Sequence, residues 1–335
     1  MRVAIYGAGA MGTLLGAYIS ASGKQIDLIT RNAGQVAALN ERGAKIVGND
    51  NFTVNVTALT PDEMSGVYDI IFLLTKQREN PKILSTLRDF LADDGVICTL
   101  QNGLPEPSVI EAVGSKRCLG CAVSWGASTV SEGVAQLNSK RKKMTFSLGS
   151  MHGNNPWTAR VKEYLECAGK VIVEENFFGA RWSKLALNSA FSPLSAVTGM
   201  TFGEVAKNKY TREVALDLLN EAFAVAQECG VKLEPIQGYD IVKIFKCKGG
   251  VKRFTAKFLL RFAMSGHNNL LSGMYFDLKA GKKCDVDFVN GVLQRLGKKF
   301  GVPTPVNDAV VNLAHEIERG ERAISRDNIK LIVKG

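Results

Sequence analysis

The stretch Val3-Ala-Ile-Tyr6-Gly7-Ala-Gly9-Ala-Met-Gly12 decides the fold of this chain. Its first four residues form an apolar run typical of a buried strand, and the run 11–21 that follows carries Leu14, Leu15 and Tyr18 at helical spacing. A G-x-G-x-x-G sequence is a weak signal alone, but between a strand and a helix it is typical of a dinucleotide-binding turn. The stretch therefore predicts the first unit of a Rossmann-type domain.

Each glycine of this turn has its own expected role. Gly7 permits the tight turn, Gly9 lets a pyrophosphate approach the backbone, and Gly12 lets the helix pack closely on the strand. The phosphates are expected at the helix N-terminus. The predicted phosphate-binding residues are Gly7, Ala8, Gly9, Ala10, Met11 and Gly12. The alternative is a turn that only joins a strand to a helix.

The end of the second predicted strand, 25–30, indicates which dinucleotide binds. NAD sites usually carry an acidic residue there to hold the ribose 2′-hydroxyl, whereas this chain has Thr30-Arg31-Asn32. A guanidinium can bind a 2′-phosphate through two hydrogen bonds, and an acid would repel it. The sequence therefore favours NADP over NAD, with Arg31 at the phosphate; the alternative is that Arg31 is an ordinary surface charge.

The rest of the chain divides into two parts with different patterns of predicted secondary structure. Further strands at 68–75 and 95–100 alternate with helices at 35–42 and 81–91, antiparallel β structure follows at 126–148, and 171–173 is a last strand. Such alternation predicts a parallel, doubly wound sheet. After Asn176, an apolar-rich helix is expected at 178–196, amphipathic helices at 210–229 and 286–300 and a further helix at 305–319, with a strand signal only at 329–333. We therefore predict an α/β protein: an N-terminal Rossmann-type, NADP-binding doubly wound domain in 1–176 and an all-helical substrate and catalytic domain in 177–335, with the active site near their join.

Composition excludes several classes of protein. The chain has 335 residues, 46% of them hydrophobic and 22% charged, which excludes disordered, collagen-like and coiled-coil proteins. Its length suggests about two domains. No apolar run approaches the ~20 residues of a membrane helix, and Met1 leads straight into a strand with no signal peptide. We expect a cytoplasmic protein with no membrane partner.

The net charge of +10 fits nucleic acid, a membrane surface or small anionic ligands as partners. The compact basic run 140–143 resembles a solvated turn, and no aromatic–basic pattern of a nucleic-acid-binding protein accompanies it. We therefore expect no nucleic acid partner.

The seven widely spaced cysteines predict reduced thiols and no metal site. Cys118-Leu-Gly-Cys121 is either a redox pair or, as we favour, two small buried residues. His315 lies outside any H-E-x-x-H zinc motif, and His267 is a weaker candidate for a substrate contact.

One face of the predicted helix 178–196 carries aligned polar groups. Lys184, Asn188 and Ser192 are spaced four residues apart, so they lie on one face of the helix. A lysine with an amide and a hydroxyl beneath a nicotinamide would provide a proton donor and hydrogen-bonding groups for a substrate. The alternative is a solvated helix face.

Taken in order, these motifs resemble the ketopantoate reductase (2-dehydropantoate 2-reductase) family over nearly the whole chain. The matching positions are Gly7–Gly12, Arg31, Lys76, Gln101-Asn102-Gly103, Lys184-Leu-Ala-Leu-Asn188 and Asp285-Val-Asp-Phe-Val-Asn-Gly291. The resemblance implies NADPH-dependent reduction of a small anionic 2-keto acid, namely 2-dehydropantoate to pantoate in pantothenate biosynthesis. It implies that Lys184 is the general acid, an assignment that also makes physical sense because an ammonium stabilises a forming alkoxide.

The resemblance also assigns roles to other residues. On the cofactor side, Lys76 would reach the 2′-phosphate and Ala127 would make a backbone contact. Asn102 would lie between the nicotinamide and the substrate, and Asp285 would steer the lysine or bind a ribose or substrate hydroxyl. The implied substrate ligands are Asn102, Lys184, Asn188, Ser192 and Ser272. A homodimer is an open alternative to a monomer.

The departures from the family pattern fall on the substrate side. Asp285 replaces the usual Glu, and Ser192 stands where Asn is common. Phe202 replaces a second Asn, and in Ser272-Gly273-Met274 either the usual Ser is offset or Gly replaces it. The alternatives are therefore a reductase of another branched or larger 2-keto acid, an opine-type or 3-hydroxy acid dehydrogenase, and a non-catalytic NADPH sensor.

Overall fold

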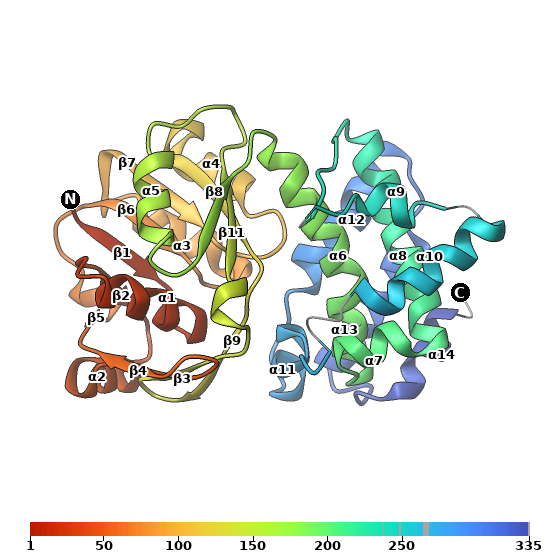
Figure 1. Cartoon of the computed structure of the whole chain (residues 1–335), viewed down its shortest axis with the longest axis horizontal. Coiled ribbons are helices and arrows are strands. Elements are labelled where there is room, and N and C mark those ends of the chain that lie inside the picture. The colour runs from red at the N-terminus through yellow and green to blue at the C-terminus, as the bar shows by residue number, and fades with distance from the viewer. Residues whose placement is uncertain (237, 248, 264–267, 334–335) are drawn as a thin grey trace. The chain divides into compact units, whose positions relative to one another are not determined.

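The computed structural model describes residues 1–236, 238–247, 249–263 and 268–333, so His267 lies outside the described residues (Figure 1). The chain forms two compact units. The first comprises Met1–Gln101 with Pro105–Phe177, and the second comprises Asn102–Leu104 with Phe178–Gly335. This division falls one residue beyond the predicted join and places the loop Asn102–Leu104 with the helical unit.

The first unit alternates strands and helices along most of its length. Its strands are β1 Val3–Tyr6, β2 Asp27–Ile29, β3 Ala44–Gly48, β4 Phe52–Val54, β5 Thr57–Leu59, β6 Tyr68–Leu73, β7 Leu91–Thr99, β8 Cys118–Val123, β9 Ala127–Ser131, β10 Val134–Leu137, β11 Thr145–Gly149 and β12 Lys170–Val173. Its helices are α1 Ala10–Ala21, α2 Ala33–Arg42, α3 Asn80–Leu87, α4 Glu106–Val113 and α5 Thr158–Leu165.

Eight strands form the main sheet, in the order β12-β11-β8-β7-β6-β1-β2-β5. All neighbours from β8 to β5 pair in parallel, whereas β11 pairs with β8 antiparallel. The chain leaves β1 toward β2 and later returns to β6 on the other side of β1. This reversal of strand order is the topological switch point, and its carboxyl edge is where such sheets bind ligands.

Helices cover both faces of this sheet (Figure 1). Alternate residues of β1 point to opposite faces, because Ile5 packs in one core with α1 and α5 residues, while Ala4 and Tyr6 pack in another with α3 and α4. The α/β doubly wound fold class predicted from the sequence is confirmed.

A second, four-stranded sheet with the order β4-β3-β10-β9 also belongs to the first unit. The antiparallel pairing of β9 with β10 agrees with the antiparallel structure expected in 126–148. Strands β3, β4 and β5 are not among our sequence-based elements. They are only three to five residues long, too short for a clear period-2 pattern.

The second unit is helical. Its helices are α6 Phe177–Thr198, whose first residue is counted with the first unit, α7 Phe202–Lys207, α8 Lys209–Glu228, α9 Ile241–Phe245, α10 Gly250–Ala263, α11 Gly273–Lys279, α12 Val286–Phe300, α13 Pro305–Glu318 and α14 Ile329–Val333. Thr201 and Glu204 form a capping box at the start of α7, and Gly301 ends α12 in the left-handed conformation. In the described part of the chain, no helix is long and apolar enough to cross a membrane.

The strand expected at 329–333 is wrong, because this segment forms helix α14. Ile329 and Ile332, three residues apart, are both buried in the helical core, and Lys330 pairs with Asp327 at 2.6 Å. A short apolar run fits either a strand or a buried helical turn, and here packing on the core decided between them.

Candidate functional site

Two of the three turn glycines are required by the fold itself. Gly7 has φ +113°, and a Cβ there would lie 2.8 Å from the backbone of Leu74 and Thr75, beyond the end of β6. A Cβ on Gly12 would lie 2.3 Å from the carbonyl oxygen of Gly7. Any side chain at either position would therefore push the turn away from the strand edge or from α1.

Gly9 is different, because a Cβ there would meet nothing within 4 Å. Its φ of −76° suits any residue, so packing within this chain does not demand glycine. The first backbone N–H of α1 with an acceptor inside the helix is that of Thr13, which donates to the carbonyl oxygen of Gly9. The N–H groups of the first three helical residues have no helical acceptor, and no side chain caps this end. The residues present thus leave room and donors for a phosphate.

A buried polar network fixes the neighbouring loop at the end of β6. The Gln101 side-chain amide donates to the carbonyl of Thr75 at 2.9 Å and to the Asn80 side chain at 2.7 Å. Its oxygen accepts hydrogen bonds from Asn80 and Thr99. Lys76 directly follows Thr75, so the network sets where the chain carrying Lys76 leaves the sheet. In the sequence, Gln101 stands out only as part of the motif Gln101-Asn102-Gly103.

Arg31 lies at the end of β2, where the ribose specificity of such domains is set. Its neighbour Asn32 is the N-cap of α2, because its side chain accepts a hydrogen bond from the N–H of Gln35. Arg31 is 66% exposed at its side chain and lies 3.5 Å from the carboxylate of Glu79. An ion pair this exposed contributes about 0–1 kcal/mol, so an incoming phosphate can replace Glu79.

Ala127 is the first residue of β9 and pairs with Leu137 of β10. Strand β9 packs against α1, so this backbone lies beside the helix that opens at the glycine turn. The preceding Gly126 donates its N–H to the hydroxyl of Ser139 at 3.1 Å.

In the helical unit, α6 is buried on nearly every side. Between residues 181 and 198 every side chain is buried except four that are partly exposed: Lys184, Leu187, Asn188 and Ser192. The three polar ones repeat every four residues, a spacing of roughly 6 Å along one face. An otherwise buried helix therefore presents a single open polar stripe.

Pro193 lies inside α6 and has no N–H to donate to the carbonyl of Ser189, four residues earlier. Asn290 of α12 supplies the missing donor, because its side-chain amide lies 2.9 Å from that carbonyl oxygen. The same amide donates to Asn307 at 2.8 Å, and Asn307 in turn donates to the carboxylate of Glu221. This buried network ties the middle of the polar stripe to α8, α12 and α13.

Ser272, which the family resemblance suggests as a substrate ligand, lies at the N-cap of α11. Ser272 is 2% exposed, its hydroxyl accepts the N–H of Tyr275 at the start of α11, and its own N–H donates to Ser195 of α6. The adjacent Gly273 has open space where a Cβ would point. Phe202 on α7 is half-buried, and its N–H donates to the carbonyl of Leu270, in the segment before α11, at 2.9 Å.

Asp285 stands just before α12, in a segment held by α13. The N–H of the preceding Cys284 donates to Glu318 at 2.7 Å. His315 bridges two carboxylates, with Nδ1 at 2.8 Å from Glu318 and Nε2 at 3.0 Å from Asp287. Burial lowers the pKa of His315, but the hydrogen bond to Glu318 and the charge of Asp287 outweigh it and raise the pKa above its ordinary value.

A pH dependence follows from this bridge. Because the folded pKa of His315 is raised, its stabilising effect is complete below about pH 6.5 and is lost as pH rises through the folded pKa. We expect His315→Gln to lower the free energy of unfolding by about 1–2 kcal/mol at pH 6 and by clearly less at pH 9. Urea unfolding of both proteins at the two pH values measures this, and an equal loss at both would contradict it.

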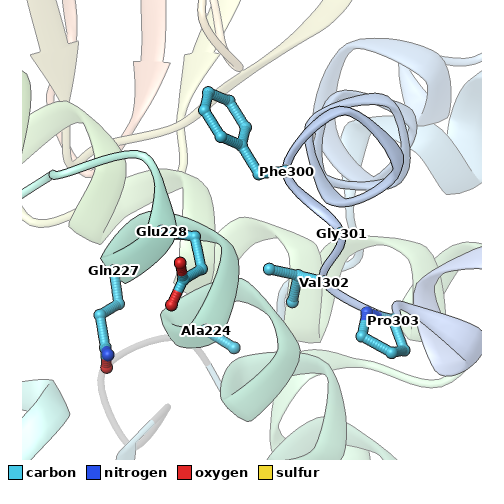
Figure 2. A pocket seen from close by; sticks show the side chains of 7 residues that line it. All are labelled: Ala224, Gln227, Glu228, Phe300, Gly301, Val302 and Pro303. Atoms are coloured by element: carbon cyan, nitrogen blue, oxygen red, sulfur yellow. The ribbon is translucent and has the colours of Figure 1, made fainter.

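Two surface hollows lie away from these residues. One of 280 Å³ lies in the helical unit, where Ala224, Gln227 and Glu228 of α8 face the segment Phe300–Pro303 (Figure 2). The other, of 790 Å³, lies in the first unit near the amino ends of β1, β6 and β8, with Asp69, Arg117 and Trp157 in its lining. Neither contains a predicted site residue.

The cysteine pair is structural. Cys118 and Cys121 are both buried in β8 but belong to the cores on opposite faces of the sheet, so their side chains diverge. Among the described residues, no group of three or more His, Cys, Asp or Glu side chains is placed to hold a metal ion.

Comparison with known families gives matches to both parts of the chain. A family model described as "Ketopantoate reductase PanE/ApbA" matches residues 3–150. A second, described as "Ketopantoate reductase PanE/ApbA C terminal", matches residues 176–318. A relative from Archaeoglobus fulgidus, named 2-dehydropantoate 2-reductase, is 30% identical over 95% of this chain and 98% of its own length.

Solved structures show the same fold. A PanE/ApbA family ketopantoate reductase from Ralstonia eutropha JMP134 matches with a TM-score of 0.81 and 24% identity, covering 96% of this chain and all of the other. D-mandelate dehydrogenase with NADH and anilino(oxo)acetate also has a TM-score of 0.81, at 22% identity and 96% and 99% coverage. A Staphylococcus aureus ketopantoate reductase described as dimeric matches with a TM-score of 0.75 and 17% identity, covering 96% of this chain and all of the other.

Proposed function

Since this chain belongs to the ketopantoate reductase family of NAD(P)-dependent oxidoreductases acting on CH–OH groups, we propose that it uses NADPH to reduce a 2-keto acid, with 2-dehydropantoate as the first candidate. One observation supports the proposal independently of family membership. The open polar stripe of α6 presents Lys184, Asn188 and Ser192 on a helix that is otherwise buried. A stripe of this kind fits a ligand-binding face better than a solvated helix.

The residues divide the work between binding and proton transfer. When bound, the reduced cofactor supplies a hydride to the keto carbon. Lys184 attracts the substrate carboxylate, stabilises the charge that develops on the keto oxygen and donates a proton to it. Asn188, Ser192 and Asn102 offer hydrogen bonds to the substrate. Asp285 orients the lysine or accepts a hydroxyl.

The first unit holds the cofactor in this proposal. The turn from Gly7 to Gly12 takes the pyrophosphate, with the open space at Gly9 as its supporting observation. Arg31 and Lys76 take the 2′-phosphate, and the backbone at Ala127 contacts the cofactor. Glu79 is displaced from Arg31 when the phosphate binds.

We expect Arg31→Ala to raise the KM for NADPH by roughly 10- to 100-fold, because a charge-assisted hydrogen bond contributes about 1.5–3 kcal/mol. The KM for NADH should change little. Arg42→Ala is the matched control, since Arg42 is equally exposed and also paired with an acid, Glu41. Initial rates with both cofactors measure the effect. An equal rise in KM for NADPH and NADH would show that Arg31 does not bind the 2′-phosphate.

A second candidate substrate is a bulkier 2-keto acid. Phe202 is apolar where the family resemblance leads one to expect Asn, Gly273 beside Ser272 has open space where a Cβ would point, and D-mandelate dehydrogenase shares this fold. An aromatic 2-keto acid such as phenylglyoxylate would use such space. The opine-type and 3-hydroxy acid dehydrogenase alternatives have no comparable support from the described residues.

The test is a matrix of initial rates. NADPH and NADH are each combined with 2-dehydropantoate, 2-oxoisovalerate, phenylglyoxylate and a 3-keto acid. The proposal predicts NADPH oxidation with 2-keto acids and the highest kcat/KM for 2-dehydropantoate or, under the second candidate, phenylglyoxylate. Tight NADPH binding without oxidation by any keto acid would indicate a sensor instead.

A further inference from the structure

Helix α10 packs on the helical unit with one side and exposes an apolar face on the other. The buried side includes Ala256 and Leu260, where α10 contacts α7, α8 and α9. The exposed apolar side chains, each at least 40% accessible, are Val251, Phe254, Phe258, Leu259 and Phe262. At about 100° per residue they span roughly 140° of the helix. Apolar side chains on both sides of a helix predict that a second surface covers the exposed ones.

Two cations border this apolar face, one along each edge. Lys252 lies beside Leu259 on the helical projection, and Arg261 lies beside Phe254. Both cations are exposed, and within the described part of the chain neither forms an ion pair with an acid. The other two cations of α10 are neutralised by carboxylates of α8, each at 2.8 Å. The two unpaired positive charges of α10 are therefore the ones that border the apolar face.

The surroundings of α10 in the sequence are also positive. The stretch 241–276 contains seven lysines and arginines and no aspartate or glutamate. Burial and the nearby charge of Arg261 lower the pKa of Arg212 on α8 below its ordinary value, although Glu213 acts in the opposite direction. Positive charge thus accumulates around Arg261, and a surface that covers this face gains by carrying negative charge.

This charge pattern distinguishes between the surfaces that could cover the face. A two-fold contact between two copies brings the same patch together, so Lys252 and Arg261 of both copies would meet with no acid of α10 to pair with them. A single-stranded nucleic acid would stack its bases on rings, which Val251 and Leu259 do not offer. An anionic bilayer fits both features, because its apolar part takes up the exposed side chains while its headgroups attract the bordering cations.

We propose that the exposed face of α10 is a docking surface for a lipid bilayer with anionic headgroups. The helix lies parallel to the bilayer, Phe254, Phe258 and Phe262 enter the boundary between headgroups and acyl chains, and Lys252 and Arg261 lie at the lipid phosphates. In the described part of the chain no helix is able to span a membrane, so the contact is peripheral. Under this proposal, the expectation of no membrane partner holds only for membrane-spanning segments.

Co-sedimentation of the full chain with lipid vesicles tests the proposal. The vesicles contain phosphatidylcholine alone or phosphatidylcholine with about 30% phosphatidylglycerol, a content that gives them the anionic surface the proposal requires. The wild-type chain should bind the anionic vesicles, and high salt should weaken this binding because it screens the charges. Lys252→Gln/Arg261→Gln should weaken it about 30-fold, roughly fivefold for each cation. Phe254→Ser/Phe258→Ser should weaken it at least ~100-fold.

Helix α12 offers matched controls in the same unit. Lys298, Lys299 and Phe300 are exposed at its end, so Lys298→Gln/Lys299→Gln and Phe300→Ser change the same kinds of side chain at another place. Both control variants should bind anionic vesicles as the wild-type chain does. Circular dichroism checks that all variants are folded.

Several results would overturn the proposal. They are a wild-type chain that binds neither kind of vesicle or binds both equally, vesicle binding that survives Phe254→Ser/Phe258→Ser, and an equal loss in the α12 controls. Without vesicle binding, a dimer in sedimentation velocity that this double variant dissociates would assign the face to a second copy, and loss of binding to a uridine oligonucleotide would assign it to nucleic acid. None of these results bears on the reductase activity, which is measured separately.

Discussion

Lys184→Ala is expected to lower kcat/KM for the 2-keto acid by more than ~10²-fold. The ammonium is asked both to stabilise the developing alkoxide and to donate the proton, so its loss removes two contributions to the transition state. The dissociation constant of NADPH, measured by fluorescence titration, should change little, because Lys184 belongs to the helical unit and the phosphate-binding turn to the other.

Lys184→Arg separates the two contributions. Arginine keeps the positive charge but does not give up its proton, so we expect KM to be largely retained and kcat to fall. Lys298→Ala is the control, because Lys298 is an exposed lysine on α12 of the same unit. A Lys184→Ala protein with full turnover would show that Lys184 is not the general acid.

Asn290→Ala is expected to lower the free energy of unfolding by about 2–4 kcal/mol. The substitution leaves the buried carbonyl of Ser189 without a donor, and it also removes the hydrogen bond to Asn307. Urea unfolding followed by circular dichroism measures the loss. Because Ser189 lies between Asn188 and Ser192 on α6, we expect KM for the keto acid to rise as well.

Pro193→Ala provides the decisive comparison, since it restores the N–H that α6 lacks. In the double variant Asn290→Ala/Pro193→Ala, the new N–H can bond to Ser189, so the double variant should be at least ~1 kcal/mol more stable than the sum of the single effects predicts. Additivity within about 0.5 kcal/mol would show that Asn290 does not act through this carbonyl.

Local sequence patterns predicted the elements whose causes are local. The turn at Gly7 and Gly12 depends on residues within one strand, one turn and one helix, and the structure places both glycines where no side chain fits. The polar stripe on α6 follows from helical periodicity alone. The strand expected at 329–333 is wrong because a run of five residues, four of them apolar, is too short to carry a period that distinguishes a strand from a helix.

Long-range hydrogen bonds are what the sequence could not show. Gln101 meets Thr75 across 26 positions, and Asn290 meets Ser189 across 101. Neither pair has a spacing or composition that marks it. Ser272 has a local role, because a serine before a short helix serves as its N-cap; its contact with a substrate stays a prediction from the family resemblance.

Transfer of deuterium tests whether hydride passes from the cofactor to the keto carbon. The enzyme is incubated with NADPH carrying deuterium on one face of nicotinamide C4, for each face in turn, and 2-dehydropantoate, and the product is examined by mass spectrometry and NMR. We expect one of the two labelled cofactors to deliver a single deuterium to the carbon that bears the new hydroxyl group. NADPH oxidation without deuterium at that carbon from either face, or no product with any 2-keto acid, would contradict it.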